Sequence, residues 1–374
     1  MSDNAVSRNE SKTMILESQQ PTQTKPLLTI AIPTYNRARF LKENLDTLFD
    51  QLLAEERVEL IVSDNACTDE TPALIEGYRQ RGLRLRYLRN EANLGPDGNI
   101  LQCFEQARGK YVWVFGDDDI LVPGGVAKIL ALLAEGDYGL AFVTPFAFHS
   151  DYIAEKTSDR FGRHAESLPG AVPFARRAGQ LIMFISAMIV NKDLYSSIPH
   201  RDLRALVGSC LVQLGWLFPV LAVSSRNLVV FDKVIGQRIE NGSGWGPCQV
   251  FGVNLMQILD DFLHDRKDIA REIQKALLQG WLPHMVMGIR RGTAGPLDVE
   301  NMHRVLEPVH RKSWRYWLFV YPLIALPLAP AVAWHSITIQ AARLKPSRVR
   351  EFLSVRYAHW RSRAAIGSGP VSRM

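Results

Sequence analysis

The first third of the chain alternates short apolar runs with stretches of helical spacing, and this alternation limits the possible folds more than any other feature. The runs with the length of buried strands are 27–33, 59–64, 84–88 and 111–115, and the stretches with helical spacing are 37–53, 72–81 and 99–108. Alternation of strand and helix at this spacing predicts an α/β fold with a mixed, mostly parallel sheet flanked by helices on both faces.

Polar residues follow three of the predicted strands directly. The segments are Thr34-Tyr35-Asn36, Ser63-Asp64-Asn65 and Asp117-Asp118-Asp119. Ligands of open parallel sheets bind beyond the carboxyl ends of the strands, so these three loops are expected to line one crevice. The first strand is not followed by GxGxxG and the sequence contains no GxxxxGK[ST], which excludes the dinucleotide fingerprint and the P-loop.

Three consecutive carboxylates, Asp117, Asp118 and Asp119, come directly after an apolar run. Like charges this close raise one another's pKa, and a hard cation relieves the repulsion. We therefore expect Mg²⁺ or Mn²⁺ here, shared with a ligand that carries phosphate. The residues alone leave open a strand followed by a solvated acidic turn.

The length and the cysteine content indicate how many domains the chain forms and which redox compartment it occupies. With 374 residues the chain exceeds one typical core, which indicates an α/β domain plus an appendage. The four cysteines are far apart and match no zinc spacing, so we expect reduced thiols in a cytosolic compartment and no structural zinc. Residues 1–26 are polar, lack the apolar region of a secretory signal and are expected to form a disordered leader.

The longest apolar stretch without a charge is 316–334, and its 19 residues are near the length that spans a bilayer. It contains Pro322, Pro327 and Pro330 and has basic residues on both sides. The prolines interrupt helical hydrogen bonding, and the flanking charges remove the asymmetry that orients a span. We expect residues 311–374 to form a basic, apolar tail on an anionic membrane surface, with a true span and a buried helical hairpin as alternatives.

Four motifs in series resemble an inverting glycosyltransferase of family 2 with the GT-A fold. They are LLTIAIPTYNR, ELIVSDNACTDET, NEANLGPDGN and GKYVWVFGDDDIL. The resemblance is strong over 27–126 and is traceable to about residue 232. The Phe-Gly-Asp-Asp-Asp form is similar to the branch that includes abequosyltransferase-like enzymes of bacterial surface polysaccharides.

The resemblance implies which residues hold a nucleotide-sugar donor. The residues matched to that site are Pro33, Thr34, Tyr35, Asp64, Asn93, Gly95, Asn99 and Asp117. Asp64 is expected to accept from the nucleobase, Asp117 to contact the ribose and Asp118 to bind the metal, with Asp119 supporting the loop. Taken alone, Asp64 could initiate a turn, and the Asn-x-Gly at 93–95 could be an ordinary turn.

The catalytic base is the point at which the chain departs from the family. An inverting transfer needs a base for the acceptor hydroxyl, and in many members this is an Asp that follows the acceptor-side strand. That strand is expected at 184–192 and the acid near 207–210, where Ser209 stands instead. Asp202 is the predicted base, while His149 and Asp151 are alternatives that could equally be surface residues or helix caps.

A glycine-rich segment at 238–246 follows the region of resemblance. Arg238 is predicted to pair with donor phosphates and Trp245 to stack on the sugar, unless the segment is an ordinary connector. Residues 250–290 have the spacing of amphipathic helices, typical of packing rather than chemistry. The expected parts are therefore a leader at 1–26, a GT-A domain at 27–235, a loop and helical region at 236–310 and the tail at 311–374.

The sequence as a whole predicts transfer of a sugar from a nucleotide-diphospho-sugar to a polyprenyl-diphosphate-linked saccharide. The expected setting is O-antigen or other surface-polysaccharide synthesis at the cytoplasmic face of a bacterial inner membrane, without nucleic acid. The alternative raised by Ser209 is a protein that binds the nucleotide sugar and has lost catalysis. A sugar-1-phosphate nucleotidyltransferase is disfavoured, because the loop after the first strand lacks the glycines of that class.

Overall fold

A computed structural model describes residues 13–16, 25–157, 164–199, 201–239, 246–292 and 299–343. The chain forms two compact units, Met1–Gln274 and Lys275–Met374. The leader expected at 1–26 lies outside the described residues except for 13–16 and its last two positions. The domain limits expected after residues 235 and 310 stay predictions.

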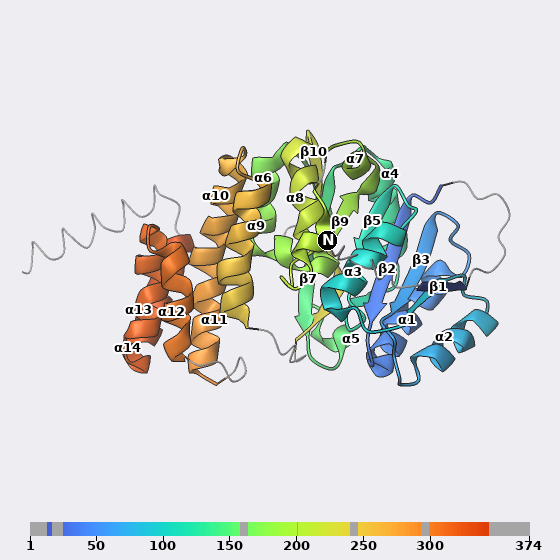
Figure 1. Cartoon of the computed structure of the whole chain (residues 1–374), viewed down its shortest axis with the longest axis horizontal. Helices are drawn as coiled ribbons and strands as arrows, with labels where there is room; N and C mark the ends of the chain where they lie inside the picture. The colour runs from blue at the N-terminus through green and yellow to red at the C-terminus, as the bar shows by residue number, and fades with distance from the viewer. Residues whose placement is uncertain are drawn as a thin grey trace, which may run out of the picture. The chain divides into compact units, whose positions relative to one another are not determined.

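The first unit is built on one sheet, to which ten strands belong in the part of the chain that the structure describes (Figure 1). They are β1 (Thr13–Leu16), β2 (Leu28–Thr34), β3 (Val58–Asp64), β4 (Arg86–Asn90), β5 (Tyr111–Val114), β6 (Ile120–Leu121), β7 (Leu140–Phe148), β8 (Ala165–Pro169), β9 (Met188–Asn191) and β10 (Arg226–Arg238). Their order is β1-β4-β3-β2-β5-β9-β7-β10-β6, with β8 also beside β10.

Most strands of the sheet point in the same direction, namely β4, β3, β2, β5, β7 and β10. The pairs β4·β3, β3·β2, β2·β5 and β7·β10 are parallel. Strand β9 lies antiparallel to both β5 and β7, so β5 and β7 also point the same way. The carboxyl ends of these parallel strands therefore share one edge of the sheet, and the predicted mixed, mostly parallel architecture is confirmed.

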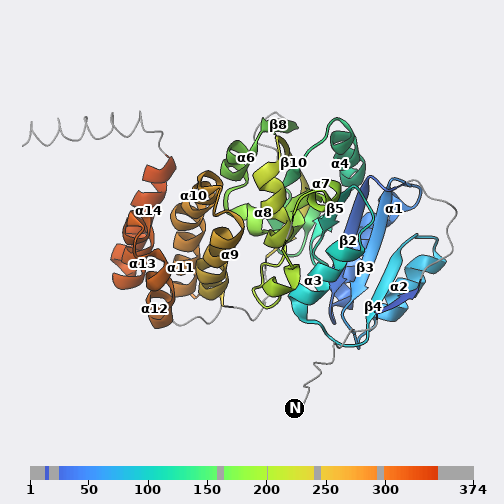
Figure 2. The same cartoon turned by 45° about the horizontal axis from the view of Figure 1, so that its top comes forward.

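Helices cover both faces of this sheet (Figure 2). The α-helices from the start of the chain to the unit boundary are α1 (Ala38–Leu52), α2 (Thr71–Gln80), α3 (Gly95–Gln106), α4 (Gly125–Ala134), α5 (Tyr152–Glu155), α6 (Ala171–Ala178), α7 (Lys192–Ser196), α8 (Leu214–Val223), α9 (Leu255–Phe262) and α10 (Lys267–Ala276), the last of which crosses that boundary. Helix α1 packs beside α2 and α4, whereas α3, α7 and α8 contact the other face. Burial on both faces explains why the strands are nearly continuous apolar runs.

Helix α3 begins earlier, and strand β9 begins later, than the sequence pattern predicts. Helix α3 starts at Gly95 rather than Asn99, because Pro96 is well accommodated in the first helical turn. The strand expected at 184–192 is β9 alone, preceded by a 3₁₀ turn, η2 (Ile185–Ala187). Ser186 explains that turn, because its carbonyl accepts from Trp113 Nε1 at 2.7 Å and its hydroxyl accepts the Gly116 N–H at 2.9 Å.

The second unit is helical in its described residues. Its elements are η5 (Leu277–Trp281), α11 (Leu282–Arg290), α12 (Val299–His310), η6 (Tyr316–Val320), α13 (Tyr321–Ala325) and α14 (Leu328–Arg343). The predicted interruption of the apolar stretch is present, because α13 ends before Pro327 and α14 begins after it. None of the helices described is both long enough and apolar enough to cross a bilayer.

Candidate functional site

The carboxyl edge of the sheet brings the predicted polar loops together. Thr34, the last residue of β2, donates its hydroxyl to Asp117 Oδ2 at 2.8 Å, although the two residues are 83 positions apart. Asp64 ends β3, which pairs with β2 along its whole length. The ends of three adjacent strands, β3, β2 and β5, therefore bring these polar residues together at one edge of the sheet.

The three aspartates differ in their access to solvent. Asp117 and Asp119 are nearly buried, with 4% and 3% of their surface exposed, whereas the Asp118 side chain keeps 19%. Burial raises the pKa of Asp117 to about 7, the Arg37 guanidinium opposes that rise and the Asp118 charge adds to it. Burial and the charge of Asp118 also raise the pKa of Asp119 well above its usual range. Asp118 is therefore the carboxylate of the three that a ligand can reach most readily.

The loop that carries these aspartates is held from two sides. Asn44 of α1 donates its amide to Gly116 O at 3.1 Å and to Asp119 O at 2.8 Å. The Arg238 backbone N–H donates to Asp119 Oδ1 at 3.2 Å. The sequence analysis missed Asn44, although an amide among the leucines of the apolar helix face was a usable signal. Asp119 is thus hydrogen-bonded to both α1 and β10, and its role as a support of the loop stays a prediction.

Arg37 is a second residue that sequence reasoning missed. Its Nη2 donates to Asp118 Oδ2 at 2.7 Å, and its Nη1 lies 3.4 Å from Asp117 Oδ1. The pKa of Arg37 is raised by these carboxylates, against the effect of its own burial. A cation from the residue that precedes α1 thus faces the aspartate cluster directly.

Arg238 lies against the aspartate loop and is engaged by its own chain. Its guanidinium pairs with Glu43, donates from Nε to Asp118 O at 3.3 Å and stacks over the Phe148 ring at 4.6 Å. Only 9% of its side chain is exposed. Its contact with donor phosphates stays a prediction. Residues 240–245, including Trp245, lie outside the described residues.

Asp64 is fully buried at the end of β3. Its Oδ1 accepts the Cys67 N–H at 2.6 Å, and its Oδ2 accepts from the Tyr87 hydroxyl. Arg89 Nε lies 3.8 Å from the same carboxylate. These contacts fix the orientation of the carboxylate, and a hydrogen bond from a nucleobase to Asp64 stays a prediction.

Asparagine amides shape the neighbouring loop at the start of α3. Asn93 Oδ1 accepts from the Asn65 amide and from the Gly95 N–H, both at 2.8 Å. Asn99 donates to Ser63 O at 2.9 Å and accepts from the Ser63 hydroxyl at 2.6 Å. The structure therefore places both predicted asparagines at the crevice as parts of one hydrogen-bonded frame.

The remaining donor-site candidates belong to the end of β2 and the turn after it. Pro33 is a β2 residue paired with Ser63 of β3, and Tyr35 is 45% exposed. Asn36 has a left-handed backbone, with φ of 51°, and its side chain accepts the Thr68 N–H at 2.7 Å. This turn presents Tyr35 to solvent at the edge of the sheet where the aspartates lie.

The candidates for the base have structural roles in the described residues. Asp202 accepts the Arg204 N–H at 3.0 Å at the start of η3 (Leu203–Leu206), and 69% of its side chain is exposed. Asp151 caps α5 in the same way, and His149 Nδ1 lies 3.0 Å from Glu155 Oε2. The assignment of the base to Asp202 stays a prediction.

The loop where an acidic base was expected is held by another carboxylate, Asp97 of α3. Asp97 Oδ2 accepts the backbone N–H groups of Gly208 and Cys210, each at 2.8 Å. Ser209, between them, uses its hydroxyl to accept the Leu211 N–H at 3.0 Å. Burial raises the pKa of Asp97, while these backbone N–H groups lower it. The loop at 207–210 is thus tied to helix α3, which begins beside the loop that contains Asn93.

The oxygen atoms of the aspartate cluster are the candidate ligands for a divalent cation. Among the residues that the structure describes, no group of three or more His, Cys, Asp or Glu is arranged to hold a metal. Asp118, with Asp117 beside it, offers hard carboxylate oxygens, and Mg²⁺ is commonly bound through one or two carboxylates together with substrate phosphates and water. These residues therefore fit a cation that is shared with a bound diphosphate rather than one held by the protein alone.

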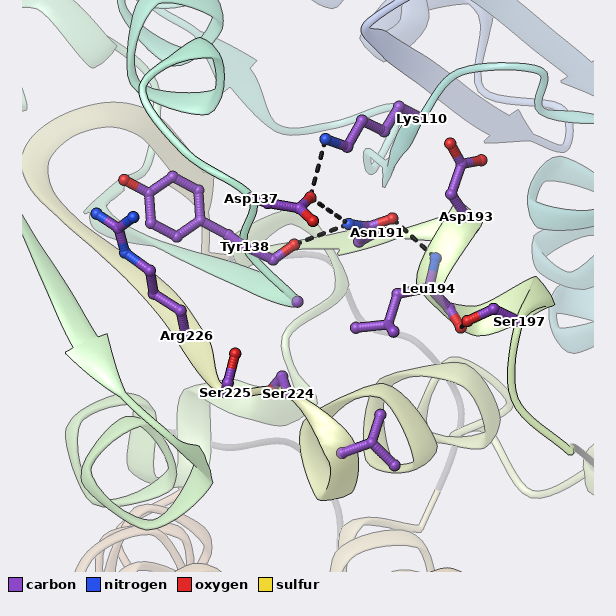
Figure 3. Close-up of a pocket in the computed structure, with 12 residues that line it drawn as sticks. Lys110, Asp137, Tyr138, Asn191, Asp193, Leu194, Ser197, Ser224, Ser225 and Arg226 are labelled. Atoms are coloured by element: carbon purple, nitrogen blue, oxygen red, sulfur yellow. Dashed lines mark hydrogen bonds and ion pairs between the residues drawn. The ribbon is translucent and has the colours of Figure 1, made fainter.

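A cavity of about 460 Å³ lies at the opposite, amino-terminal edge of the sheet (Figure 3). Its lining includes Lys110 just before β5, Gly139 just before β7 and Arg226 at the start of β10. The polar groups there pair with one another: Lys110 Nζ lies 2.8 Å from Asp137 Oδ1 (Figure 3). We therefore place the functional site at the aspartate edge and not in this cavity.

The sequence is similar to a known protein family and to two glycosyltransferases of bacteria. Residues 29–193 match the model of the family described as glycosyl transferase family 2. The chain is 30% identical over 184 residues to abequosyltransferase RfbV of Salmonella typhimurium, which covers 46% of this chain and 55% of that protein. It is 30% identical over 112 residues to GalNAc(5)-diNAcBac-PP-undecaprenol beta-1,3-glucosyltransferase of Campylobacter jejuni, covering 30% and 36%. The matched region thus spans about half or less of the length of these curated relatives.

Solved structures share the fold over a larger part of the chain. TarS 1-349 of S. aureus in complex with UDP superposes with a TM-score of 0.57 at 18% identity, covering 83% of this chain and 88% of that one. Its complex with UDP-GlcNAc gives the same TM-score and covers 84% and 91%. At this identity the likeness establishes the architecture, which is the GT-A fold predicted from the sequence.

Proposed function

We propose, from the match of residues 29–193 to the glycosyl transferase family 2 model, that the chain transfers a sugar from a nucleotide-diphospho-sugar to a saccharide acceptor, with Mg²⁺ or Mn²⁺ as cofactor. The acceptor is a polyprenyl-diphosphate-linked saccharide of O-antigen or another surface polysaccharide. Inversion at the anomeric carbon is the stereochemical course that the family resemblance implies.

One observation carries this proposal: the hydrogen bond from Thr34 to Asp117, which joins the ends of β2 and β5 beside the partly exposed Asp118. A carboxylate cluster at the carboxyl edge of a parallel sheet lies where such folds bind nucleotides. The raised pKa of Asp117 has burial as its first cause, so a cationic or hydroxyl-bearing ligand would relieve an electrostatic cost that the protein carries alone.

Each residue of the crevice has a definite task in this proposal. Asp118 holds the cation, which supplies charge stabilisation to the departing nucleoside diphosphate when it is bound. Thr34 orients Asp117, whose carboxyl group contacts the ribose hydroxyls. Asp64, fixed by Cys67 N–H and the Tyr87 hydroxyl, accepts a hydrogen bond from the nucleobase.

The acceptor side needs a base that takes the proton from the attacking hydroxyl. We assign this to Asp202, whose carboxylate precedes the loop at 207–210 and is exposed, so the saccharide of the acceptor can reach it. Ser209 lacks the basicity for this step, and Asp97 uses its carboxylate to hold the loop.

Two observations support a lipid-linked acceptor at the cytoplasmic face of the inner membrane. The Campylobacter relative is named as a transferase acting on a PP-undecaprenol saccharide. In the second unit, Trp314, Trp317 and Leu328 are exposed, while Tyr316 and Val320 are fully buried. An amphipathic, aromatic surface flanked by basic residues is typical of peripheral attachment to anionic lipid.

A thermal-shift screen tests the proposal, with UDP-, GDP-, CDP- and dTDP-sugars each added together with Mn²⁺. A ligand at a hundredfold excess over its dissociation constant stabilises the native state by about 2.7 kcal/mol, which is readily measured. The donor that stabilises the protein should then be hydrolysed slowly or transferred to an acceptor. Stabilisation without any release of sugar would support the binding-only alternative, and no stabilisation by any donor would contradict the proposal.

A further inference from the structure

Arg37 makes two contacts with the aspartate cluster that the proposed reaction does not explain. Its Nη2 donates to Asp118 Oδ2 at 2.7 Å, and its Nη1 forms an ion pair with Asp117 Oδ1 at 3.4 Å. The Asp118 oxygen that it binds belongs to the carboxylate assigned to the divalent cation. A metal that approaches Asp118 therefore meets a carboxylate that already has a positive partner.

The other guanidinium beside the cluster is fixed in place. Arg238 is 9% exposed, pairs with Glu43 and donates to His149 O at 3.1 Å. Arg37, by contrast, keeps 34% of its side chain exposed and rests on the Phe40 ring at 5.0 Å. Rotating Arg37 toward solvent would break its contacts with Asp117 and Asp118, which are the contacts that the exchange replaces. Moving Arg238 would instead break its pairing with Glu43 and its hydrogen bond to His149 O.

We propose that Arg37 is an exchangeable counter-ion, which neutralises Asp117 and Asp118 in the donor-free protein and passes to the donor diphosphate when the divalent cation takes Asp118. The inference rests on the proposed function, because it assumes that a cation and a diphosphate share this crevice. The guanidinium fork matches phosphate oxygens as well as it matches carboxylates, so the exchange preserves its hydrogen bonds.

The exchange has a thermodynamic consequence. A cation that arrives alone must displace Arg37 without giving it a new partner, so it binds weakly. A cation that arrives with a diphosphate offers Arg37 that partner, so each ligand raises the affinity of the other by the same factor. Arg37 would thus make metal binding depend on the donor.

Calorimetric titration of Mn²⁺ into the full chain, without nucleotide and then with UDP, GDP, CDP or dTDP, tests this inference. Arg37→Gln should bind Mn²⁺ alone at least about tenfold more tightly than the wild type, which corresponds to about 1.4 kcal/mol. The same variant should lose most of the coupling between Mn²⁺ and the nucleoside diphosphate. Arg39→Gln is the matched control, because Arg39 is the same residue type, 85% exposed, two positions away, and should leave both quantities unchanged.

Arg37→Lys provides a second variant that keeps the charge and removes the fork. It should bind Mn²⁺ alone with nearly wild-type affinity and still lose coupling, and wild-type coupling in this variant would overturn the transfer of Arg37 to the diphosphate. If Arg37→Gln binds Mn²⁺ alone no more tightly than the wild type, the counter-ion exchange is wrong. If Asp118→Asn keeps full Mn²⁺ affinity, or no protein binds Mn²⁺ with any nucleotide, the proposed metal site itself is wrong.

Discussion

Asp97 holds Gly208 across 111 positions of sequence, by accepting its backbone N–H on Oδ2 at 2.8 Å. The same oxygen accepts the N–H of Cys210, also at 2.8 Å. Gly208 and Cys210 both have left-handed backbones, with φ of 96° and 60°, and for Cys210 this conformation carries strain. A single buried carboxylate thus stabilises an unfavourable conformation of the loop at 207–210.

Asp97→Ala should lower the free energy of unfolding, because two backbone N–H groups lose their acceptor. A hydrogen bond to a charged group contributes about 1.5–3 kcal/mol to stability. Urea denaturation measures the change. Asp137→Ala is the control, since Asp137 is 79% exposed, has a surface ion pair with Lys110 and accepts a long hydrogen bond of 3.3 Å from Asn191, and should cost about 1 kcal/mol. Equal losses of unfolding free energy in the two variants would contradict the stabilising role of the hydrogen bonds from Gly208 and Cys210 to Asp97.

The reactivity of Cys210 should show whether Asp97 holds the loop at 207–210 in place. Burial raises the pKa of Cys67 and Cys103 to about 12 and that of Cys248 to about 11, so all three are protonated and shielded at pH 8. Cys210 is less buried and should react first with a disulfide reagent. Asp97→Ala should speed that reaction by releasing the loop, and peptide mapping of the labelled site measures it. Labelling of Cys67 before Cys210 would contradict the described burial.

The sheet and the meeting of Thr34 with Asp117 could be predicted from the sequence, because strands buried on both faces are apolar runs whose carboxyl ends share one edge. The roles of Arg37 and Asp97 could not. Each resembles an ordinary residue at a helix start, and its importance depends on a partner more than eighty positions away. Local patterns carry no information on such pairings.

Arg238 is a predicted site residue whose partner could likewise not be predicted from the local sequence. A cation in a glycine-rich segment favours a phosphate contact, but the sequence cannot reveal that Glu43, 195 positions earlier, pairs with it. Asp202 was chosen as the nearest acid to Ser209, and the structure adds that it caps a 3₁₀ turn. Sequence proximity alone does not separate a cap from a base.

Asp64→Ala should weaken the binding of the nucleotide-sugar donor more than it slows the reaction at saturating donor. The proposed contact with the nucleobase is similar in the ground and transition states, so the apparent dissociation constant of the donor should rise while the rate at saturation changes little. The variant should also be less stable, because the Cys67 N–H and the Tyr87 hydroxyl lose their acceptor. Initial rates over a range of donor concentrations give both constants. A fall in the saturated rate alone would assign Asp64 a different task.

Membrane attachment should depend on exposed apolar residues of the second unit. Trp314 is 58% exposed and Leu328 is 44% exposed, so replacing both by Ser removes apolar contact area without opening the core. The affinity for anionic vesicles, measured by sedimentation, should fall by at least roughly tenfold, because burial of one large apolar side chain contributes about 1.5–3 kcal/mol. Ile153→Ser, at a 74% exposed position in the first unit, is the control. Unchanged sedimentation of the double variant would place the attachment elsewhere.

The central claim, metal-dependent transfer at the aspartate edge, is tested most directly by Asp118→Asn. The measurement is release of nucleoside diphosphate from the stabilising donor with Mn²⁺, in the wild type, in Asp118→Asn and in the control Asp137→Asn. We predict that Asp118→Asn folds normally and is at least about 100-fold slower, a loss of about 2.7 kcal/mol of transition-state stabilisation, while the control matches the wild type. Full turnover by Asp118→Asn at the same Mn²⁺ concentration would contradict the account.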